Sequence, residues 1–224
     1  MRCLRSFIAS LQGLFKVNTY FYQIRFRFMA SKFYPVLYQF FAGISRLTGN
    51  RKKFMNLGFD NNAPFPVHPG DETDAHHIAL YSQLLKAVPG MIDKPENYSV
   101  LEVGCGRGGG CYVLQKYFNQ KKITGIDISS GNIRIARKLV SGVLFEVGNA
   151  DTFQFPEKFD LVVNLESSHT YPSRKTFFEN VTAVMHEKSF FAFGDVMRKE
   201  RAEAVEQMLQ ESGLKILHTE TINE

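Results

Sequence analysis

The sequence predicts an α/β fold built on a doubly wound parallel sheet with helices on both faces. From Tyr98 onward, stretches of strand length alternate with stretches of helix length. The strand-like stretches are almost continuously apolar, as expected when a parallel sheet is covered on both faces. A glycine-rich stretch, VLEVGCGRGGG at 100–110, falls between the first strand and the first helix. That junction is where open α/β sheets bind nucleotides.

Each element follows from its local pattern. A helix is expected over 74–88, because Asp71 and Thr73 are capping residues and the apolar residues after them have helical spacing. Pro89 and Gly90 end it. The further strands are expected at 98–104, 122–128, 143–150, 159–167, 189–196 and 214–220, and the helices between them at 109–118, 132–139, 174–185 and 199–212.

The first 59 residues differ from the rest in charge. The chain has 224 residues and a net charge of +5, yet its first acidic residue is Asp60 and ten Lys and Arg residues precede it. We therefore divide it into a basic, aromatic helical leader over 1–59 and a mildly acidic domain over 60–224. Leader helices are expected over 4–15 and 21–43, the second kinked at Pro35.

The leader has two interpretations of equal weight. Its longest uncharged run has 13 residues, whereas a membrane-spanning helix needs about 20. Basic residues among Phe and Tyr suit either a helical lid on the domain or a segment at a membrane surface. The expected location is the cytoplasm, peripherally at a membrane, with mitochondrial import as a lesser alternative because the N-terminus is Arg-bearing and acid-free.

The three cysteines are too few and too scattered for a disulfide framework and favour a reducing compartment. The histidines have no spacing that completes a zinc site, so no metal is expected.

The glycine-rich stretch fits two cofactors. Gly104, Gly106 and Gly109 match the G-x-G-x-x-G of dinucleotide enzymes, a weak signal alone. Glu102, two residues before the first glycine, would be repelled by a pyrophosphate but attracted by the ammonium of S-adenosyl-L-methionine. Glu102 therefore favours S-adenosylmethionine over NAD.

Carboxylates after the next two strands agree with this choice. Asp127 is expected to bind the ribose hydroxyls, and Asp151 the adenine amino group. Each has a plainer alternative: Asp127 as a helix cap, Asp151 as a turn residue, Glu102 as a partner of Arg107. Their joint placement favours the cofactor. The expected cofactor-binding residues are Glu102, Gly104, Cys105, Gly106, Gly108, Asp127, Ile128, Ala150, Asp151 and Asn164.

With VLEVGCGRGGG, ITGIDIS, GNAD and FDLVVNLESSHTYP in place, the chain from about Phe54 onward resembles the class I S-adenosylmethionine-dependent methyltransferases, which have a Rossmann-like sheet. The resemblance is strongest to the phthiotriol/phenolphthiotriol dimycocerosates methyltransferases, mainly through NLESSHTYP and NLGF, and looser to the sterol C-methyltransferases. It implies methyl transfer to a lipid-like or other hydrophobic small-molecule acceptor.

His169 is the expected catalytic base, because its ordinary pKa suits proton removal at neutral pH and it follows the fourth strand. Glu166 is expected to orient it or to contact the cofactor, and Asp195 either faces substrate or caps a helix. A loop histidine with no catalytic role is the plainer alternative. O-methylation of a hydroxyl is the first expectation, because the nearer family does it. C-methylation of a sterol, with aromatic faces stabilising a carbocation, is the alternative.

The expected sheet lacks the last, antiparallel strand of the class I fold, since the sixth strand comes at the end of the chain. This leaves that strand as an expected exposed edge. It also keeps open a truncated, cofactor-binding protein with impaired catalysis. An NAD-dependent oxidoreductase is disfavoured because no hydride-site motif is present. Nucleic-acid methylation is disfavoured because the domain is acidic and has no base-methylation motif.

Overall fold

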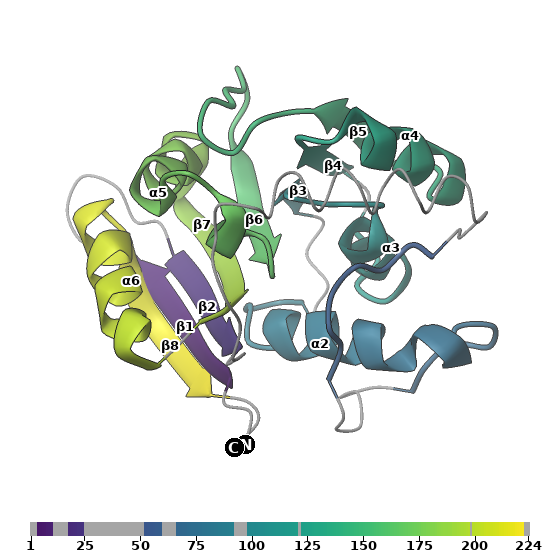
Figure 1. Ribbon diagram of the computed structural model, residues 1–224, viewed down its shortest axis with the longest axis horizontal. Helices are drawn as coiled ribbons and strands as arrows, with labels where there is room; N and C mark the ends of the chain where they lie inside the picture. Colours follow the sequence, from purple (N-terminus) through teal and green to yellow (C-terminus); the bar gives the residue numbers. More distant parts are fainter. Residues whose placement is uncertain are drawn as a thin grey trace.

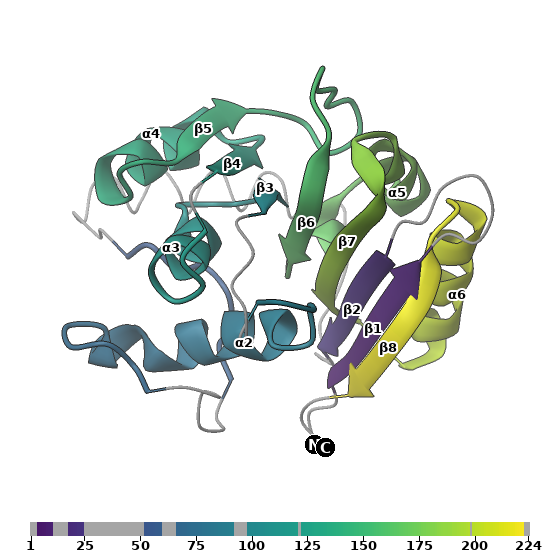
Figure 2. The same ribbon diagram turned by 180° about the vertical axis from the view of Figure 1, so that it is seen from behind.

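The computed structural model describes residues 4–10, 18–24, 52–59, 66–91, 98–120, 122–197 and 199–221. In these ranges the strands form one sheet in the order β1-β8-β2-β7-β6-β3-β4-β5, with an additional pairing of β1 with β2 (Figures 1 and 2). Neighbours among β3, β4, β5, β6 and β7 all pair in parallel. The predicted doubly wound parallel sheet is therefore confirmed.

From α2 onward the elements begin and end within a few residues of their predicted bounds. The strands are β1 (Leu4–Ser10), β2 (Asn18–Ile24), β3 (Ser99–Val103), β4 (Lys122–Asp127), β5 (Leu144–Val147), β6 (Phe159–Leu165), β7 (Met185–Val196) and β8 (Lys215–Thr221). The helices are α2 (Ala75–Leu85), α3 (Gly109–Lys116), α4 (Ser130–Leu139), α5 (Arg174–Ala183) and α6 (Lys199–Glu211), with 3₁₀ turns η2 (Glu72–Asp74) and η3 (Ser168–Thr170). None of these helices is long and apolar enough to cross a membrane.

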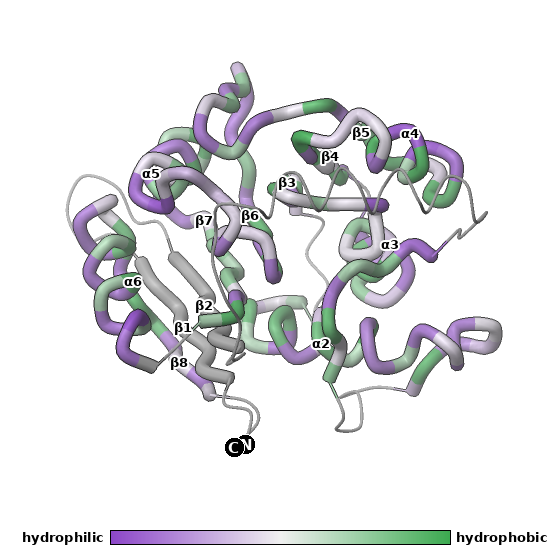
Figure 3. The backbone as a smooth tube through the Cα atoms, in the orientation of Figure 1, coloured by the Kyte–Doolittle hydropathy of each residue, from purple (hydrophilic) through white to green (hydrophobic). Residues whose placement is uncertain are grey.

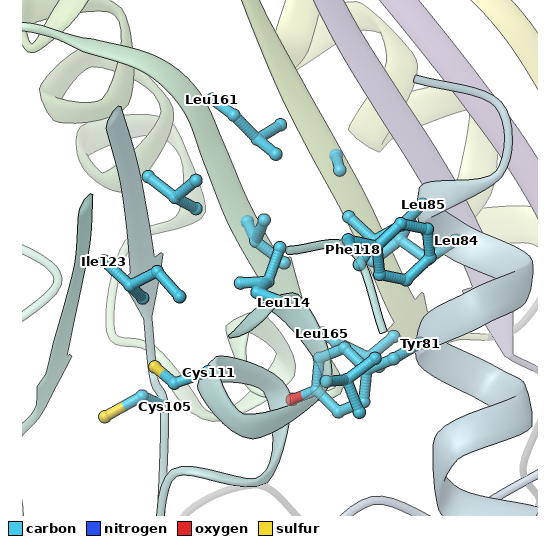
Figure 4. Close-up of a cluster of buried hydrophobic side chains, with 14 of the residues drawn as sticks. Tyr81, Leu84, Leu85, Cys105, Cys111, Leu114, Phe118, Ile123, Leu161 and Leu165 are labelled. Carbon is cyan, nitrogen blue, oxygen red and sulfur yellow. The ribbon is translucent and has the colours of Figure 1, made fainter. Parts of the chain in front are cut away.

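The helices form two layers, one on each face of the sheet, and each layer packs on the sheet through its own hydrophobic cluster. One cluster joins α2, α3 and α4 to one face of the sheet, and the other joins α5 and α6 to the opposite face. In the first, Tyr81, Leu84 and Leu85 of α2 lie near Leu114 of α3 and the neighbouring Phe118 (Figure 4). On α6, hydrophobic and hydrophilic residues alternate along the helix, as an amphipathic surface helix requires (Figure 3).

The order of the strands also fixes where a ligand binds. The chain runs outward from β3 through β4 to β5, then crosses to the other side of β3 and continues with β6 and β7. At such a reversal the loops after neighbouring strands diverge and leave a crevice at the carboxyl ends of the strands. The site therefore lies beyond the ends of β3, β4 and β6.

The predicted leader helices are wrong over 4–10 and 21–24, which belong to strands β1 (Leu4–Ser10) and β2 (Asn18–Ile24). These segments are rich in aromatic and β-branched residues, which favour strands when a sheet edge is within reach. β8 supplies that edge, pairing antiparallel with β1 and parallel with β2. The rest of the predicted leader helices lies outside the described residues.

No strand follows β8 in the part of the chain that the structure describes, as the sequence led us to expect. The expected exposed edge at this strand is instead occupied by β1 and β2.

Candidate functional site

A cavity of about 400 Å³ lies at the carboxyl ends of β3, β4 and β6. Its walls combine the glycine turn after β3 with the ends of two further strands. The lining comprises 53–56, Tyr81, 103–106, Gly109, 127–129, Asn132, 148–150, 165–167 and 170–172. The sequence predicted most of these groups together, because the ends of neighbouring parallel strands meet at one edge.

The glycines after β3 are required by backbone geometry. Gly104, Gly106 and Gly108 have φ angles of +74°, +55° and +85°, a region that L side chains rarely adopt. A Cβ on Gly104 would also lie 2.6 Å from the Tyr171 hydroxyl oxygen. The turn therefore brings bare backbone to the cavity wall, where Gly104, Cys105 and Gly106 all lie.

The Glu102 carboxyl does not line the cavity. It is buried, at 1% exposure, between α2 and α3, and accepts hydrogen bonds from the Tyr81 hydroxyl at 2.7 Å and the Cys111 thiol at 2.9 Å. Burial raises its pKa to about 7 despite these two donors. Glu102 thus lies behind Tyr81, which lines the cavity. Glu102 is not itself a wall residue, although the sequence predicted that it contacts a cofactor directly.

Asp127 lies in the wall and also organises it. Its carboxylate accepts hydrogen bonds from the backbone N–H of Gly106 at 3.0 Å and of Ser129 at 2.8 Å. It therefore joins the glycine turn to Ser129, the residue before α4. Because Ser129 itself caps α4, the capping role left open as the alternative for Asp127 is not what the structure shows. Ile128 follows in the wall and is 70% exposed. Burial raises the pKa of Asp127.

After β5, Asn149 and Ala150 line the cavity, whereas Asp151 lies next to the wall and outside it. The Asp151 backbone N–H donates to the Asn149 side-chain oxygen at 2.9 Å, and its buried Oδ1 has no partner among the described residues. Ala150 lies in the wall, and the binding of an adenine ring nitrogen by the backbone near it stays a prediction. The role assigned to Asp151 stays a prediction.

Asn164 is fully buried beneath the glycine turn and outside the cavity lining. Its Nδ2 donates to the Val103 carbonyl at 2.8 Å, the Ser167 hydroxyl at 2.7 Å and the Tyr171 hydroxyl at 3.0 Å. Asn164 therefore fixes the end of β3 against the loop after β6, and supports the wall from behind.

Glu166, at the end of β6, is the most strained acid in the wall. It has a φ angle of +50°, which is rare for a residue with a side chain and clusters at functional sites. Its Oε2 accepts a hydrogen bond from the Leu57 N–H at 2.7 Å, while its buried Oε1 has no partner among the described residues. Burial, reinforced by the charge of Asp195, raises the pKa of Glu166 to about 8.

His169 is not a wall residue, although Ser167 and Thr170 on either side of it in the chain are, and its side chain is 23% exposed. Its Nδ1 is 2.6 Å from Oδ1 of the fully buried Asp195, at the end of β7. Burial lowers the His169 pKa, but the charge of Asp195 and its hydrogen bond to the ring together outweigh this and raise the pKa overall. Ser168 and Arg174 hold the other Asp195 oxygen, with Arg174 at 3.3 Å.

The structure thus makes Asp195 the partner of His169. The sequence left its role open, because nothing in the local pattern shows which loop faces the end of β7. The pKa of Asp195 is lowered: burial raises it, and His169 and Arg174 more than compensate.

One wall was not predicted from the sequence: the strap, residues 52–59. It runs past α3 toward α2 (Figure 1) and brings Phe54, Met55 and Asn56 to the cavity. One end is held by Lys53, whose ammonium is 3.4 Å from the buried Asp71 carboxylate. The Asp71 carboxylate also accepts from Tyr112, Lys116 and Tyr117. The only sequence signal for the strap was the resemblance carried by NLGF.

No group of three or more His, Cys, Asp or Glu residues that could hold a metal ion occurs in the described ranges. The absence of a bound metal stays a prediction.

Comparison with known proteins agrees with this geometry. A family model described as a methyltransferase domain matches residues 94–221. A fatty-acid O-methyltransferase of Mycolicibacterium smegmatis is 32% identical over 80% of this chain and 65% of its own length. A phthiotriol/phenolphthiotriol dimycocerosates methyltransferase of Mycobacterium tuberculosis is 30% identical over 76% of this chain and 63% of its own. The chain thus spans slightly less than two thirds of either relative.

Among solved structures, the [4+2]-cyclase SpnF superposes with a TM-score of 0.58 at 15% identity, covering 84% of this chain and 74% of that one. At that identity the similarity concerns the fold alone.

Proposed function

The chain belongs to the class I S-adenosylmethionine-dependent methyltransferases, and on that premise we propose that it transfers the methyl group of S-adenosylmethionine to a hydroxyl of a lipid-like acceptor. The His169–Asp195 pair, in the loop whose residues 167 and 170 line the cavity and at the end of β7, carries this proposal, because an alcohol must lose a proton to accept a methyl group. Two relatives whose names denote methyl transfer to lipids support the class of acceptor.

The residues present fit this cofactor better than a dinucleotide. Two buried oxygens of wall residues, Oδ1 of Asn132 and Oε1 of Glu166, have no donor among the described residues. Unpaired acceptors require a ligand that donates hydrogen bonds. Both cofactors have ribose hydroxyls and an adenine amino group that donate, but S-adenosylmethionine adds an ammonium, which also donates, whereas a dinucleotide adds a pyrophosphate, which only accepts. The carboxylate of Asp127 in the wall would also repel phosphate charge.

When bound, S-adenosylmethionine supplies a methyl group on a positively charged sulfur. The residues of this chain have to align the acceptor oxygen and remove its proton. With Nδ1 of His169 facing Asp195, Nε2 is the nitrogen that takes this proton. The buried Asp195 carboxylate stabilises the imidazolium that forms, and Arg174 and Ser168 keep that carboxylate in place. Glu166, which holds a proton below about pH 8, lies in the wall nearby.

Calorimetry with the full chain tests the cofactor, and labelled S-adenosylmethionine with a lipid extract tests the transfer. We expect S-adenosylmethionine and S-adenosylhomocysteine to bind and NAD not to bind. We expect His169→Gln to lower methyl transfer by roughly 10² to 10⁴-fold with cofactor affinity unchanged. Binding of NAD alone would refute the proposal. A labelled sterol carbon would replace it with C-methylation, and cofactor binding without any labelled lipid would favour the impaired-catalysis alternative.

Peripheral membrane contact through residues 1–59 is part of the same proposal, with the cytoplasm as the location. Ten basic residues and no acidic one give this segment the charge that anionic headgroups attract. An acceptor that resides in a membrane would make such contact useful, since the protein would then bind where its substrate is concentrated.

A further inference from the structure

The side chains of strap residues 54–57 alternate between the domain and solvent. Phe54 and Asn56 are buried, whereas Met55 and Leu57 are 38% and 57% exposed. An extended segment is expected to alternate in this way, but its exposed positions usually carry polar side chains. Scattered apolar residues on a surface need no explanation. Here the two lie side by side on one face of one segment, at the edge of the cavity.

Several contacts fix this face in place. The Asn56 side chain donates to the His77 carbonyl at 3.0 Å, and the Phe59 N–H donates to the His76 carbonyl at 2.9 Å. The Phe54 ring stacks on His77, with 5.5 Å between ring centroids. A surface held in advance loses little entropy when a ligand binds.

The exposed pair continues the wall of the cavity. Met55 is itself a wall residue, and its sulfur lies 3.0 Å from the position that a Cβ on Gly106 would occupy. Leu57 is joined to the wall through its N–H, which donates to Glu166 at 2.7 Å. Glu166 in turn is close enough to His169 for the two charges to interact. The apolar face therefore leads from the glycine turn toward the proposed base.

The size of the cavity requires an outer binding surface. Its volume of about 400 Å³ is near the lower end of the usual range for ligand pockets, roughly 300 to 1,000 Å³. A cavity filled by a nucleoside cofactor leaves room for the reacting end of an acceptor only, so a long apolar chain must lie outside it.

We propose that the outward face of the strap, formed by Met55 and Leu57, binds the apolar chain of a lipid-like alcohol while its hydroxyl enters beside Glu166 and His169. This inference rests on the proposed function and adds which residues select an apolar acceptor. Leu57 is a better position to mutate than Met55, because a substitution changes only its exposed side chain while its N–H can still donate to Glu166.

The test measures binding of a fatty alcohol that carries a terminal pyrene, the probe. Pyrene fluorescence reports the binding, at alcohol concentrations below those at which the alcohol aggregates and with S-adenosylhomocysteine present. We expect Leu57→Gln to weaken binding of this probe by about tenfold or more, and Leu57→Met to restore it. Leu144→Gln is the matched control, since Leu144 is 54% exposed on β5 and should leave binding unchanged. Calorimetry should show the same cofactor affinity in all four proteins.

Two results would overturn the proposal. In one, the wild type binds the cofactor but not the pyrene-labelled alcohol; in the other, the Leu57→Gln variant binds that alcohol as tightly as the wild type does. If that variant keeps probe affinity but loses binding to phosphatidylcholine vesicles or dissociates from a dimer, the face contacts a bilayer or a second copy instead. Failure of the wild type to bind S-adenosylmethionine would instead refute the proposed function.

Discussion

Asp71 and Glu166 hold opposite ends of the same strap, and they differ in how well their oxygens are paired. The Asp71 carboxylate is 3% exposed and accepts hydrogen bonds from two tyrosines and two lysines. Glu166 accepts one hydrogen bond from backbone, and its other oxygen has no donor in the described chain. Although burial raises the pKa of both groups, the donors around Asp71 bring its pKa to about 2, whereas that of Glu166 is about 8.

The difference separates a structural carboxylate from one that awaits a ligand. A buried acid with a full set of donors is ionised and stabilises the fold, while a buried acid without them holds a proton and is costly to ionise. Asp71 therefore belongs to the scaffold of the strap, and Glu166 to the site that the strap covers.

The largest expected effect is on stability. Asp71→Asn leaves two lysines and two tyrosines without their shared acceptor, and should lower the free energy of unfolding by about 3 kcal/mol at pH 7. Urea denaturation at pH 7 measures this. Asp74→Asn is the control, because the Asp74 side chain is 21% exposed and its ion pair with Lys53 is long, at 3.5 Å. A loss no larger than that of the control would show that the Asp71 cluster is not a structural anchor.

The opposite sign is expected at the other end of the strap. The pKa of Glu166 is raised in the folded protein, so the stability that it contributes is complete below about pH 4.5 and is lost as pH rises through about 8. Glu166→Gln removes this loss while an amide oxygen can still accept from Leu57. The cofactor-free variant should therefore exceed wild type by on the order of 1 to 2 kcal/mol at pH 9, and match it near pH 5. Equal stability at both pH values would contradict the contrast with Asp71.

The smallest effect is expected at Glu102, which has two donors and a pKa of about 7, between the two extremes. Because Glu102 is largely protonated at pH 6 and lies behind the wall, Glu102→Gln should change S-adenosylmethionine affinity by less than about threefold there. At pH 8.5 the ionised wild type attracts the cationic cofactor, so the variant should bind roughly threefold more weakly. Calorimetry at the two pH values tests this; a large loss at pH 6 would mean direct contact with the cofactor.

The domain from β3 onward was predictable because its patterns are local. Each buried strand is a short apolar run, and helices α4 and α5 start at the capping residues Ser129 and Ser173. The leader was mispredicted over β1 and β2, because strand formation there depends on β8, about 200 residues away along the chain. No local period reveals such a partner.

The candidate site was predictable where a residue's place in a strand fixes its position. Gly104, Gly106, Asp127 and Ala150 lie in the cavity wall because they end, or closely follow, strands of one parallel sheet. The same reasoning placed Glu102 and Asn164 at this edge, but it could not show that their side chains point into the protein interior and not into the cavity. It also placed His169 without identifying Asp195 as its partner.

By itself, the sequence determined the parallel sheet, the glycine turn and the set of strand ends that form the site, since apolar period and backbone geometry are encoded within a few residues. Only the tertiary structure decided which acids are paired. The donors to Asp71 come from α3 and the strap, the partner of His169 from β7, and the donor to Glu166 from Leu57, more than 100 residues earlier in the chain. Ionisation and hydrogen bonding depend on neighbours in space, and packing brings those neighbours together.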